Sequence, residues 1–208
     1  MSISLSQMSE THMDILRELG NIGSGYAATS LSVLMDRKVL VSGPEVRLSS
    51  AIPGDGVKAA PSGGECIAAR IDFTGDTSGA VLFLFTMKEA EELTAGLTVP
   101  VSYEHSDDMS SLWHSAISEI GNILASSYLR ALSIFTGLKI NMGPSRLMMA
   151  DAAAATWETL SLFGSADETF MSIEESFLFS GQKECGKVML LMNGESINPI
   201  MHSFEVEN

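Results

Sequence analysis

Two stretches of the chain repeat one pattern of polar residues at helical spacing. The first copy is Asp14, Glu18, Asn21 and Gly25, and the second copy is Ser115, Glu119, Asn122 and Ser126. Because an α-helix has 3.6 residues per turn, steps of four, three and four residues return to nearly the same direction. Each copy therefore predicts a stripe along one helix, with a carboxylate and a carboxamide one turn apart. A carboxylate can pair with a cation, and a carboxamide can both donate and accept hydrogen bonds, so each stripe could bind and orient another molecule.

The apolar residues of both stretches predict which side of each helix is buried. They lie opposite the stripes and are Ile15, Leu16, Leu19 and Ile22 in the first copy and Ile117, Ile120, Ile123 and Leu124 in the second. Each helix should therefore face a core on one side and solvent on the other. Glu and Asn on an exposed helix face are ordinary, and one copy alone would carry no functional weight. The identical Glu/Asn pair at matched places in two otherwise diverged stretches favours a functional interpretation.

The composition predicts a globular protein and argues against several functions. The chain has 208 residues, of which 45% are hydrophobic and 18% are charged, so it can bury a sizeable core. Its formal net charge of −14 argues against binding to nucleic acids or to anionic membrane surfaces. No signal sequence or membrane-inserting stretch is evident, and Cys66 and Cys185 lack the spacing of a disulfide framework or a metal site. We expect an acidic cytoplasmic protein with both cysteines in its core.

Two further motifs near the stripes have simpler explanations. Gly20, Gly23 and Gly25 resemble a phosphate-binding loop only loosely, because they lie inside an amphipathic helix with no strand before it. Close helix packing or close approach of a partner is the better interpretation, since a glycine inside a helix costs about 1 kcal/mol. His12 and His114 precede the two stripes without a second residue at metal-ligand spacing, so we expect surface or capping roles for them.

The order of predicted elements is the same in the two halves of the chain. The first half predicts a helix over 13–35 with Thr11 as N-cap, a strand over 37–48 with a turn or bulge at Gly43-Pro44, strands over 66–73 and 79–86, and a short helix over 88–97. The second half predicts a helix over 114–132, strands over 138–142, 170–179 and 187–192, and a closing helix over 197–204. Segment 49–64 is expected to be a loop, segment 150–166 a corresponding Ala-rich or polar excursion between strands, and 98–107 a linker.

Three registers support an internal duplication. Asn21 matches Asn122, Gly43-Pro44 matches Gly143-Pro144, and segment 78–85 matches segment 185–192. We expect one α+β domain over 1–208, made of two repeats at about 8–100 and 108–208. Its predicted architecture has pseudo-two-fold symmetry, with about six strands in a mostly antiparallel sheet and the two long stripe-bearing helices packed on it.

Both stripes resemble the (Asp/Ser)-x-x-x-Glu-x-x-Asn-x-x-x-Gly signature of the CheC/CheX/FliY family of chemotaxis phosphatases. The surroundings also match, with Glu-Leu-Gly-Asn-Ile-Gly-Ser-Gly-Tyr-Ala-Ala around Asn21 and Ser-Glu-Ile-Gly-Asn-Ile-Leu around Asn122. The resemblance covers almost the whole chain, and two intact Glu/Asn pairs make it most similar to the CheC branch. One departure is Ser126, which occupies the final glycine position of the second signature.

The resemblance implies hydrolysis of the aspartyl phosphate on CheY, the response regulator of two-component chemotaxis signalling. Phosphoryl transfer of this kind depends mainly on placing a water in line with the phosphorus. By the resemblance, Asn21 and Asn122 orient that water. Glu18 and Glu119 pair with the active-site lysine of the regulator.

The remaining stripe residues are assigned weaker roles by the same resemblance. Asp14 and Ser115 support or cap their helices, and Gly25 lets the backbone of the partner approach, with Ser126 at the matched position. No cofactor or metal of the chain's own is implied, because Mg²⁺ is supplied by the regulator. The deamidase CheD is a second implied partner.

Two other classes of function stay open. The chain could be a non-catalytic scaffold of the flagellar switch that holds CheY, or a regulator that acts mainly by binding CheD. The intact Asn21 and Asn122 favour the enzyme, because a docking surface has no need of an amide that places water.

Overall fold

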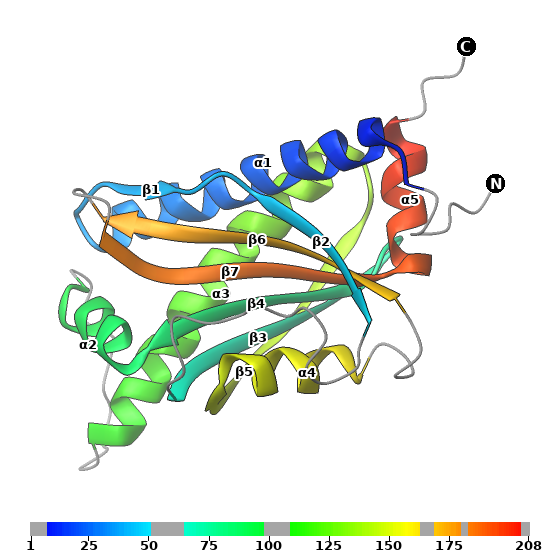
Figure 1. Cartoon of the computed structure of the whole chain (residues 1–208). Helices are drawn as coiled ribbons and strands as arrows, with labels where there is room; N and C mark the ends of the chain where they lie inside the picture. Colours follow the sequence, from blue (N-terminus) through cyan, green and yellow to red (C-terminus); the bar gives the residue numbers. More distant parts are fainter. Residues whose placement is uncertain (1–7, 51–64, 98–108, 163–168, 180–182, 205–208) are drawn as a thin grey trace.

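The computed structural model describes residues 8–50, 65–97, 109–162, 169–179 and 183–204 (Figure 1). The helices are α1 (Glu10–Leu34), α2 (Met87–Ala95), α3 (Met109–Thr136), α4 (Ala152–Leu160) and α5 (Gly194–Phe204). The strands are β1 (Val39–Val41), β2 (Glu45–Ser50), β3 (Glu65–Gly75), β4 (Gly79–Thr86), β5 (Ile140–Asp151), β6 (Thr169–Phe179) and β7 (Lys183–Asn193). The predicted α+β class is confirmed.

All strand pairs in the described residues are antiparallel and form one sheet. Its order is β1-β6-β7-β4-β3-β5, and β2 also pairs with β6. From the central pair β7 and β4, the next strands outward are β6 and β3. The outermost strands are β1 and β2, both paired with β6, at one edge and β5 at the other. At each step outward from the centre, a strand of one predicted repeat thus lies opposite its counterpart from the other repeat, as a duplication would produce. The division of the chain into two repeats stays a prediction.

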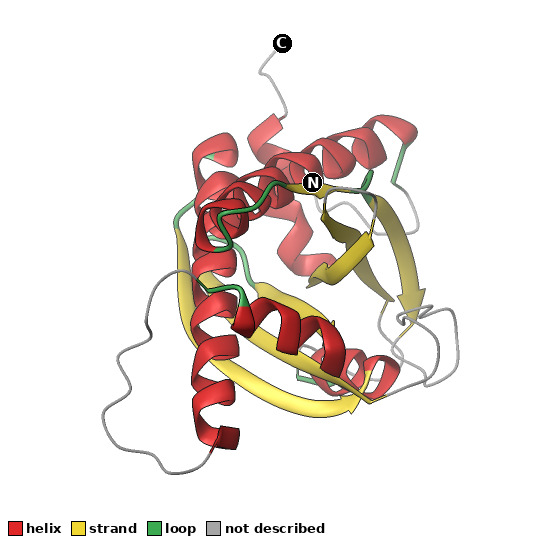
Figure 2. Ribbon diagram, turned by 90° about the vertical axis from the view of Figure 1, so that its left-hand side faces the viewer, coloured by secondary structure: helices red, strands yellow, loops and turns green. Residues whose placement is uncertain are grey.

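Helices cover the two faces of the sheet unequally. The main core joins α1, α2, α3 and α5 to the inner face of the sheet, and its members include Leu16, Leu31, Phe83, Ile120 and Phe177. A smaller core lies on the outer face under α4. The strong twist of the sheet is visible in Figure 2. Burial of this apolar surface holds the two long helices against the sheet.

The smaller core on the outer face was not expected, because segment 150–166 was predicted to be an Ala-rich or polar excursion between strands. Instead residues 152–160 form α4, whose N-cap Asp151 accepts a hydrogen bond from the Ala154 N–H at 2.9 Å. Alanine has the highest helix propensity, and the run of alanines packs closely on the sheet through Ala152 and Ala155. The expected loop 49–64 and linker 98–107 lie almost entirely outside the described residues.

The start of α1 differs from the prediction by one turn or less. Ser9, not Thr11, is the N-cap: its hydroxyl accepts from the His12 N–H at 3.3 Å, and His12 Nδ1 accepts from the Ser9 N–H at 3.0 Å. This reciprocal pair satisfies two donors at the helix start, which Thr11 could not do from its position inside the helix. The capping role expected for His12 is confirmed.

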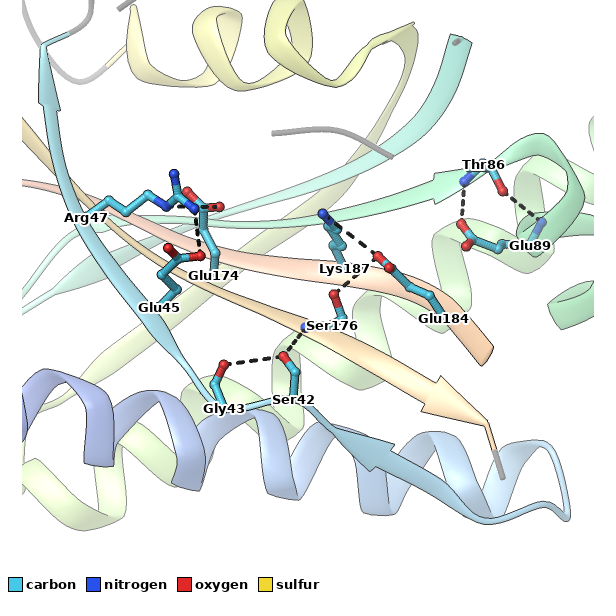
Figure 3. A network of polar contacts seen from close by, with 10 residues as sticks. All are labelled: Ser42, Gly43, Glu45, Arg47, Thr86, Glu89, Glu174, Ser176, Glu184 and Lys187. Atoms are coloured by element: carbon cyan, nitrogen blue, oxygen red, sulfur yellow. Dashed lines mark hydrogen bonds and ion pairs between the residues drawn. The ribbon is translucent and has the colours of Figure 1, made fainter. Parts of the chain in front are cut away.

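The two Gly-Pro pairs act differently in the sheet. Gly43-Pro44 separates β1 from β2, so the sheet has seven strands in the described residues and not about six. Both strands still pair with β6, and Ser42 bridges the gap by exchanging hydrogen bonds with the backbone of Ser176 at 2.8 and 2.9 Å (Figure 3). Gly143-Pro144 does not end its strand as predicted.

Strand β5 instead continues through Gly143-Pro144 to Asp151 as one edge strand. Ile71 of β3 pairs with Ser145 and Phe73 pairs with Met142, so Gly143 and Pro144 form a bulge opposite Asp72. An edge strand tolerates proline because the missing N–H costs no ladder hydrogen bond on the open side.

Both cysteines are buried, as expected. Cys66 lies in the outer core and Cys185 in the main core, each at most 2% exposed. Burial raises the pKa of the Cys185 thiol to about 12, so this side chain stays protonated and packs as a small apolar group.

Candidate functional site

The first stripe lies on the outer surface of α1. Asp14, Glu18 and Asn21 are exposed, and Gly25 is half-buried. The Asp14 carboxylate accepts a hydrogen bond from Arg17 at 2.6 Å, so it is paired within its own helix. The side chains of Glu18 and Asn21 make no hydrogen bond or ion pair with any described residue. They are therefore available to a second molecule.

The second stripe lies in the same way on α3. Ser115, Glu119 and Ser126 are exposed, and Asn122 is half-buried. Within the described ranges, neither Glu119 nor Asn122 has a side-chain hydrogen bond or ion pair. The structure thus brings each predicted Glu next to its Asn on one open helix face.

The opposite faces of both helices are buried much as predicted. Leu16 and Leu19 of α1 are buried, as are Ile117, Ile120 and Leu124 of α3. The remaining members, Ile15, Ile22 and Ile123, are only half-buried. They lie at the border of the buried sector. In α1, the centre of that sector is filled by small residues of the same helix.

Those small residues are the glycines that the sequence left ambiguous. A Cβ at Gly20 would lie 2.6 Å from Glu175 Oε1, and a Cβ at Gly23 would lie 2.7 to 2.9 Å from the Tyr128 ring. A Cβ at Gly25 would meet nothing within 4 Å. Close packing therefore explains Gly20 and Gly23, and it does not explain Gly25, which opens to solvent beside the stripe.

The two sites are separate because the helices that carry them run in opposite directions. Figure 1 shows α1 running from dark to lighter blue, against the course of α3. They meet where Gly23 packs on Tyr128 and where the hydroxyls of Ser30 and Ser127 lie 2.6 Å apart. Asn21 and Asn122 each precede this crossing in their own helix, so they lie on opposite sides of it.

Both asparagines stand beside a glycine that seats the helix on the sheet. Gly20 precedes Asn21 and packs on Glu175 and Ile173. Gly121 precedes Asn122, and a Cβ there would lie 3.1 Å from Ala69 Cβ. The backbone of each asparagine is therefore held close to a strand, which fixes the position from which its carboxamide extends.

Three polar residues under the first site escaped the sequence analysis. Glu175 is 3% exposed, Ser24 is fully buried and Tyr128 is 1% exposed, and all three lie between α1, α3 and β6. The alternation of β6 contained a signal, because Glu175 shares its parity with the inward-facing Ile173 and Phe177. An acidic residue at an inward position of a strand marks a buried carboxylate.

Two general features of the described residues bear on the site. They contain no group of three or more His, Cys, Asp or Glu residues that could hold a metal ion. None of their helices is long and apolar enough to cross a membrane.

Comparison with family models gives a match that includes both stripes. A model of the CheC-like family matches residues 11–47 and 114–144, the segments that hold both Glu/Asn pairs. A curated relative from Bacillus subtilis (strain 168), named CheY-P phosphatase CheC, is 36% identical over 137 residues. This alignment covers 63% of each chain, so the match spans less than two thirds of that relative.

Solved structures show the same fold over more of the chain. FliY of Thermotoga maritima matches with a TM-score of 0.71 at 20% identity, covering 95% of this chain and 97% of that chain. The CheX–CheY–BeF₃–Mg²⁺ complex of Borrelia burgdorferi matches with a TM-score of 0.50 at 13% identity, covering 84% and 96%. At these identities the likeness concerns the fold alone.

Proposed function

We propose, from the match to the CheC-like family model and to the curated CheC relative, that this chain is a chemotaxis phosphatase of the CheC/CheX/FliY family that hydrolyses the aspartyl phosphate of phospho-CheY. One observation carries the proposal. Each long helix presents an exposed Glu and an Asn one turn apart, with side chains that no described residue engages. Residues kept unpaired at two matched places are suited to engage a partner.

The reaction needs little covalent chemistry from this chain. A water attacks the phosphorus, the bond from phosphorus to the regulator's aspartate oxygen breaks, and inorganic phosphate leaves with the carboxylate restored. Asn21 or Asn122 accepts a hydrogen bond from the water and donates another, which fixes the water in line with the breaking bond. Mg²⁺ is proposed to arrive on the carboxylates of the regulator, so this chain supplies no metal ligand.

Binding is assigned to the neighbouring carboxylates. Glu18 and Glu119 each pair with a lysine at the regulator's active site, which aligns the helix with the phosphoryl group. Asp14 is already paired with Arg17, which fits a supporting role, and Gly25 leaves room beside Asn21 for the backbone of the regulator.

The relatives support this substrate. The Bacillus subtilis relative is named for its action on CheY-P, and the Borrelia burgdorferi CheX is seen bound to CheY. We propose the same partner class here, and on the resemblance alone we add CheD and a cytoplasmic location.

The experiment is the double substitution Asn21→Ala with Asn122→Ala. A CheY-type regulator is phosphorylated with acetyl phosphate, and release of inorganic phosphate is followed with catalytic amounts of each variant. We expect the double variant to lose the acceleration and to keep its folding. Neither asparagine side chain has a partner in the described residues, and substitutions away from packed or paired groups usually change stability by no more than about 0.5 kcal/mol. Asn141→Ala, an exposed asparagine on β5, is the matched control and should behave as wild type.

Two results would contradict the proposal in different ways. If the double variant accelerates phosphate release like wild type, the asparagines do not place the water. If wild type binds the regulator without accelerating release, the chain is a non-catalytic CheY-binding module. CheD binding measured in parallel would then separate a switch scaffold from a CheD regulator.

A further inference from the structure

A carboxylate is buried directly beneath the first site. Glu175 lies on β6 and faces the main core, with 3% of its surface exposed. Neither of its carboxylate oxygens has a hydrogen-bond partner among the described residues. Buried carboxylates are normally paired, because an unpaired polar group in a core carries its full desolvation cost. This one is in neither of the two motifs used by the proposed reaction.

The carboxylate touches the helix turn that carries Asn21. A Cβ at Gly20 would lie 2.6 Å from Glu175 Oε1, so the helix backbone rests on the carboxyl group. Ser24, one turn later, is fully buried, and its hydroxyl donates to the Gly20 carbonyl at 2.9 Å. Both contacts fall on the buried side of the turn whose outer side holds Asn21.

The groups that face Glu175 come from the elements packed around it. From α3, Tyr128 is the ionisable side chain that the structure places near it, and from α1 the facing residues are Gly20 and Ser24. The paired position on β7 is Val188. No cation is recorded near Glu175 in the described residues, so its charge would be uncompensated.

The matched place under the second site holds no ionisable group. A Cβ at Gly121 would lie 3.1 Å from Ala69 Cβ, 3.5 Å from Ser145 Oγ and 3.6 Å from Ile71 Cδ1, whereas Gly20 meets Ile173 and Glu175. Ile71 thus occupies beneath Gly121 the place that Glu175 occupies beneath Gly20. The two sites share their surface residues and differ in what supports them.

We propose that Glu175 is a positioning residue of the first site, whose protonation state sets how α1 is seated on β6 and hence where Asn21 is held. The inference rests on the proposed phosphatase function. It gives the two sites different dependence on pH, with the second site as an internal reference.

The Ser24 hydroxyl has two hydrogen-bonding arrangements, one for each protonation state of Glu175. When Glu175 is neutral, the Ser24 hydroxyl is free to donate to the Gly20 carbonyl, as the structure shows. When Glu175 is ionised, the carboxylate needs a donor, and the Ser24 hydroxyl has only one proton to give. Turning that proton to Glu175 removes a hydrogen bond from the helix turn, and leaving it in place keeps a bare charge under Gly20. Either outcome weakens the packing of α1 on β6.

The pH range follows from burial. Burial raises the pKa of Glu175 to about 7, and the nearby Ser24 hydroxyl offsets part of the rise. Burial also raises the pKa of Tyr128 well above its ordinary value, so the phenol stays neutral in this range. Glu175 therefore changes charge near neutral pH.

The experiment measures each site alone. Asn122→Ala leaves the first site active, and Asn21→Ala leaves the second. Phosphate release from a CheY-type regulator phosphorylated with acetyl phosphate is measured from pH 6 to pH 8, and the first-site rate is divided by the second-site rate. The division removes the pH dependence of the regulator itself. If only the neutral form seats Asn21 correctly, the ratio should fall by up to about tenfold across this range.

Substitution of the carboxylate supplies the second arm. Glu175→Gln keeps the shape and stays neutral, so the ratio should become constant with pH at its low-pH value. Glu174→Gln is the matched control, because Glu174 is the next residue of the same strand and lies on the outer face beside Arg47 (Figure 3). It removes the same charge and should leave the pH dependence of the ratio intact.

Each outcome decides the proposal. The proposal is overturned if the ratio of first-site to second-site rate is constant from pH 6 to pH 8 in the proteins that keep Glu175. It is also overturned if the ratio falls equally when Glu175→Gln is added. Hydrogen exchange of the Asn21 and Ser24 amides across the same range tests the wild-type helix directly, even if Glu175→Gln folds poorly. Unchanged exchange relative to the Asn122 amide would also overturn it. Absence of hydrolysis at both sites would instead refute the proposed phosphatase function.

Discussion

At the scale of single residues, the two sites are defined by which polar side chains are already engaged. Asp14 is paired with Arg17 on its own helix. Glu18 and Asn21 on α1, like Glu119 and Asn122 on α3, have no partner within the described part of the chain. A carboxylate that is exposed and unpaired loses nothing inside the protein when a cationic partner binds it.

The charge of the two glutamates can therefore be reversed with little effect on folding. We expect Glu18→Lys together with Glu119→Lys to weaken binding of the regulator, because like charges brought together at an interface cost several kcal/mol. Affinity for the CheY-type regulator, measured by titration calorimetry at constant ionic strength, checks this. Each reversal changes the net charge by two, so the double variant changes it by four. Glu158→Lys, on α4 over the other face of the sheet, changes it by two and is the control; it should leave the affinity unchanged. Affinity unchanged by the double reversal would remove the ion pair from the mechanism.

At the scale of secondary-structure elements, the glycines of α1 show that the same residue type serves two purposes. Gly23 lets α1 and α3 cross closely at Tyr128, and Gly25 lies on the outside with open space around it. The packing of α1 on α3 thus depends on Gly23 and not on Gly25. The sequence could not separate them, because both are mid-helix glycines two residues apart.

Alanine substitutions should separate these two glycines by the sign of their effect. Gly23→Ala places a Cβ less than 3 Å from the packed Tyr128 ring. Overpacking of this kind costs about 1 to 3 kcal/mol, which outweighs the gain of about 1 kcal/mol in helix propensity, so the substitution should destabilise the protein. Gly25→Ala gains the propensity without a clash and should stabilise the protein by up to about 1 kcal/mol. Urea unfolding followed by circular dichroism measures both. Equal effects of the two substitutions would contradict the packing at Tyr128.

At the scale of the whole molecule, buried acidic groups make the free energy of unfolding depend on pH. Burial raises the pKa of Glu175 from 4.5 to about 7 and also raises the pKa of the half-buried Glu174. The folded state therefore binds more protons than the unfolded state between these values. Stability is highest at the acidic end of this window and falls as the pH rises, since the native carboxyl must ionise in the core.

This dependence predicts the behaviour of Glu175→Gln in unfolding experiments. From pH 5 to pH 8, ionisation of Glu175 should lower the free energy of unfolding of wild type by on the order of 2 kcal/mol, and the substitution should remove that loss. Urea unfolding at four pH values in this range measures the difference between the two proteins. A difference that does not grow with pH would show that Glu175 titrates at an ordinary pKa in the folded state.

The sequence alone determined much of the local structure. Helical spacing located both stripes and the apolar faces behind them, because a period of 3.6 residues is a property of the chain itself. It also predicted β4 at residues 79–86 with its observed bounds, and the cores around Cys66 and Cys185. Local rules failed where an answer depended on a neighbour: Gly143-Pro144 is tolerated because β5 is an edge strand, and residues 152–160 fold as a helix over the outer face.

The tertiary structure decided what lies beneath each site. Asn21 and Asn122 have similar sequence surroundings, yet Gly20 rests on a carboxylate and Gly121 rests on Ala69, Ser145 and Ile71, which are not ionisable. Glu175 is more than 150 residues from Asn21 in the chain, and only the seating of α1 on β6 brings them together. Long-range packing of this kind has no local signature, because the free energy of a buried charge is set by the groups around it and not by its neighbours in sequence.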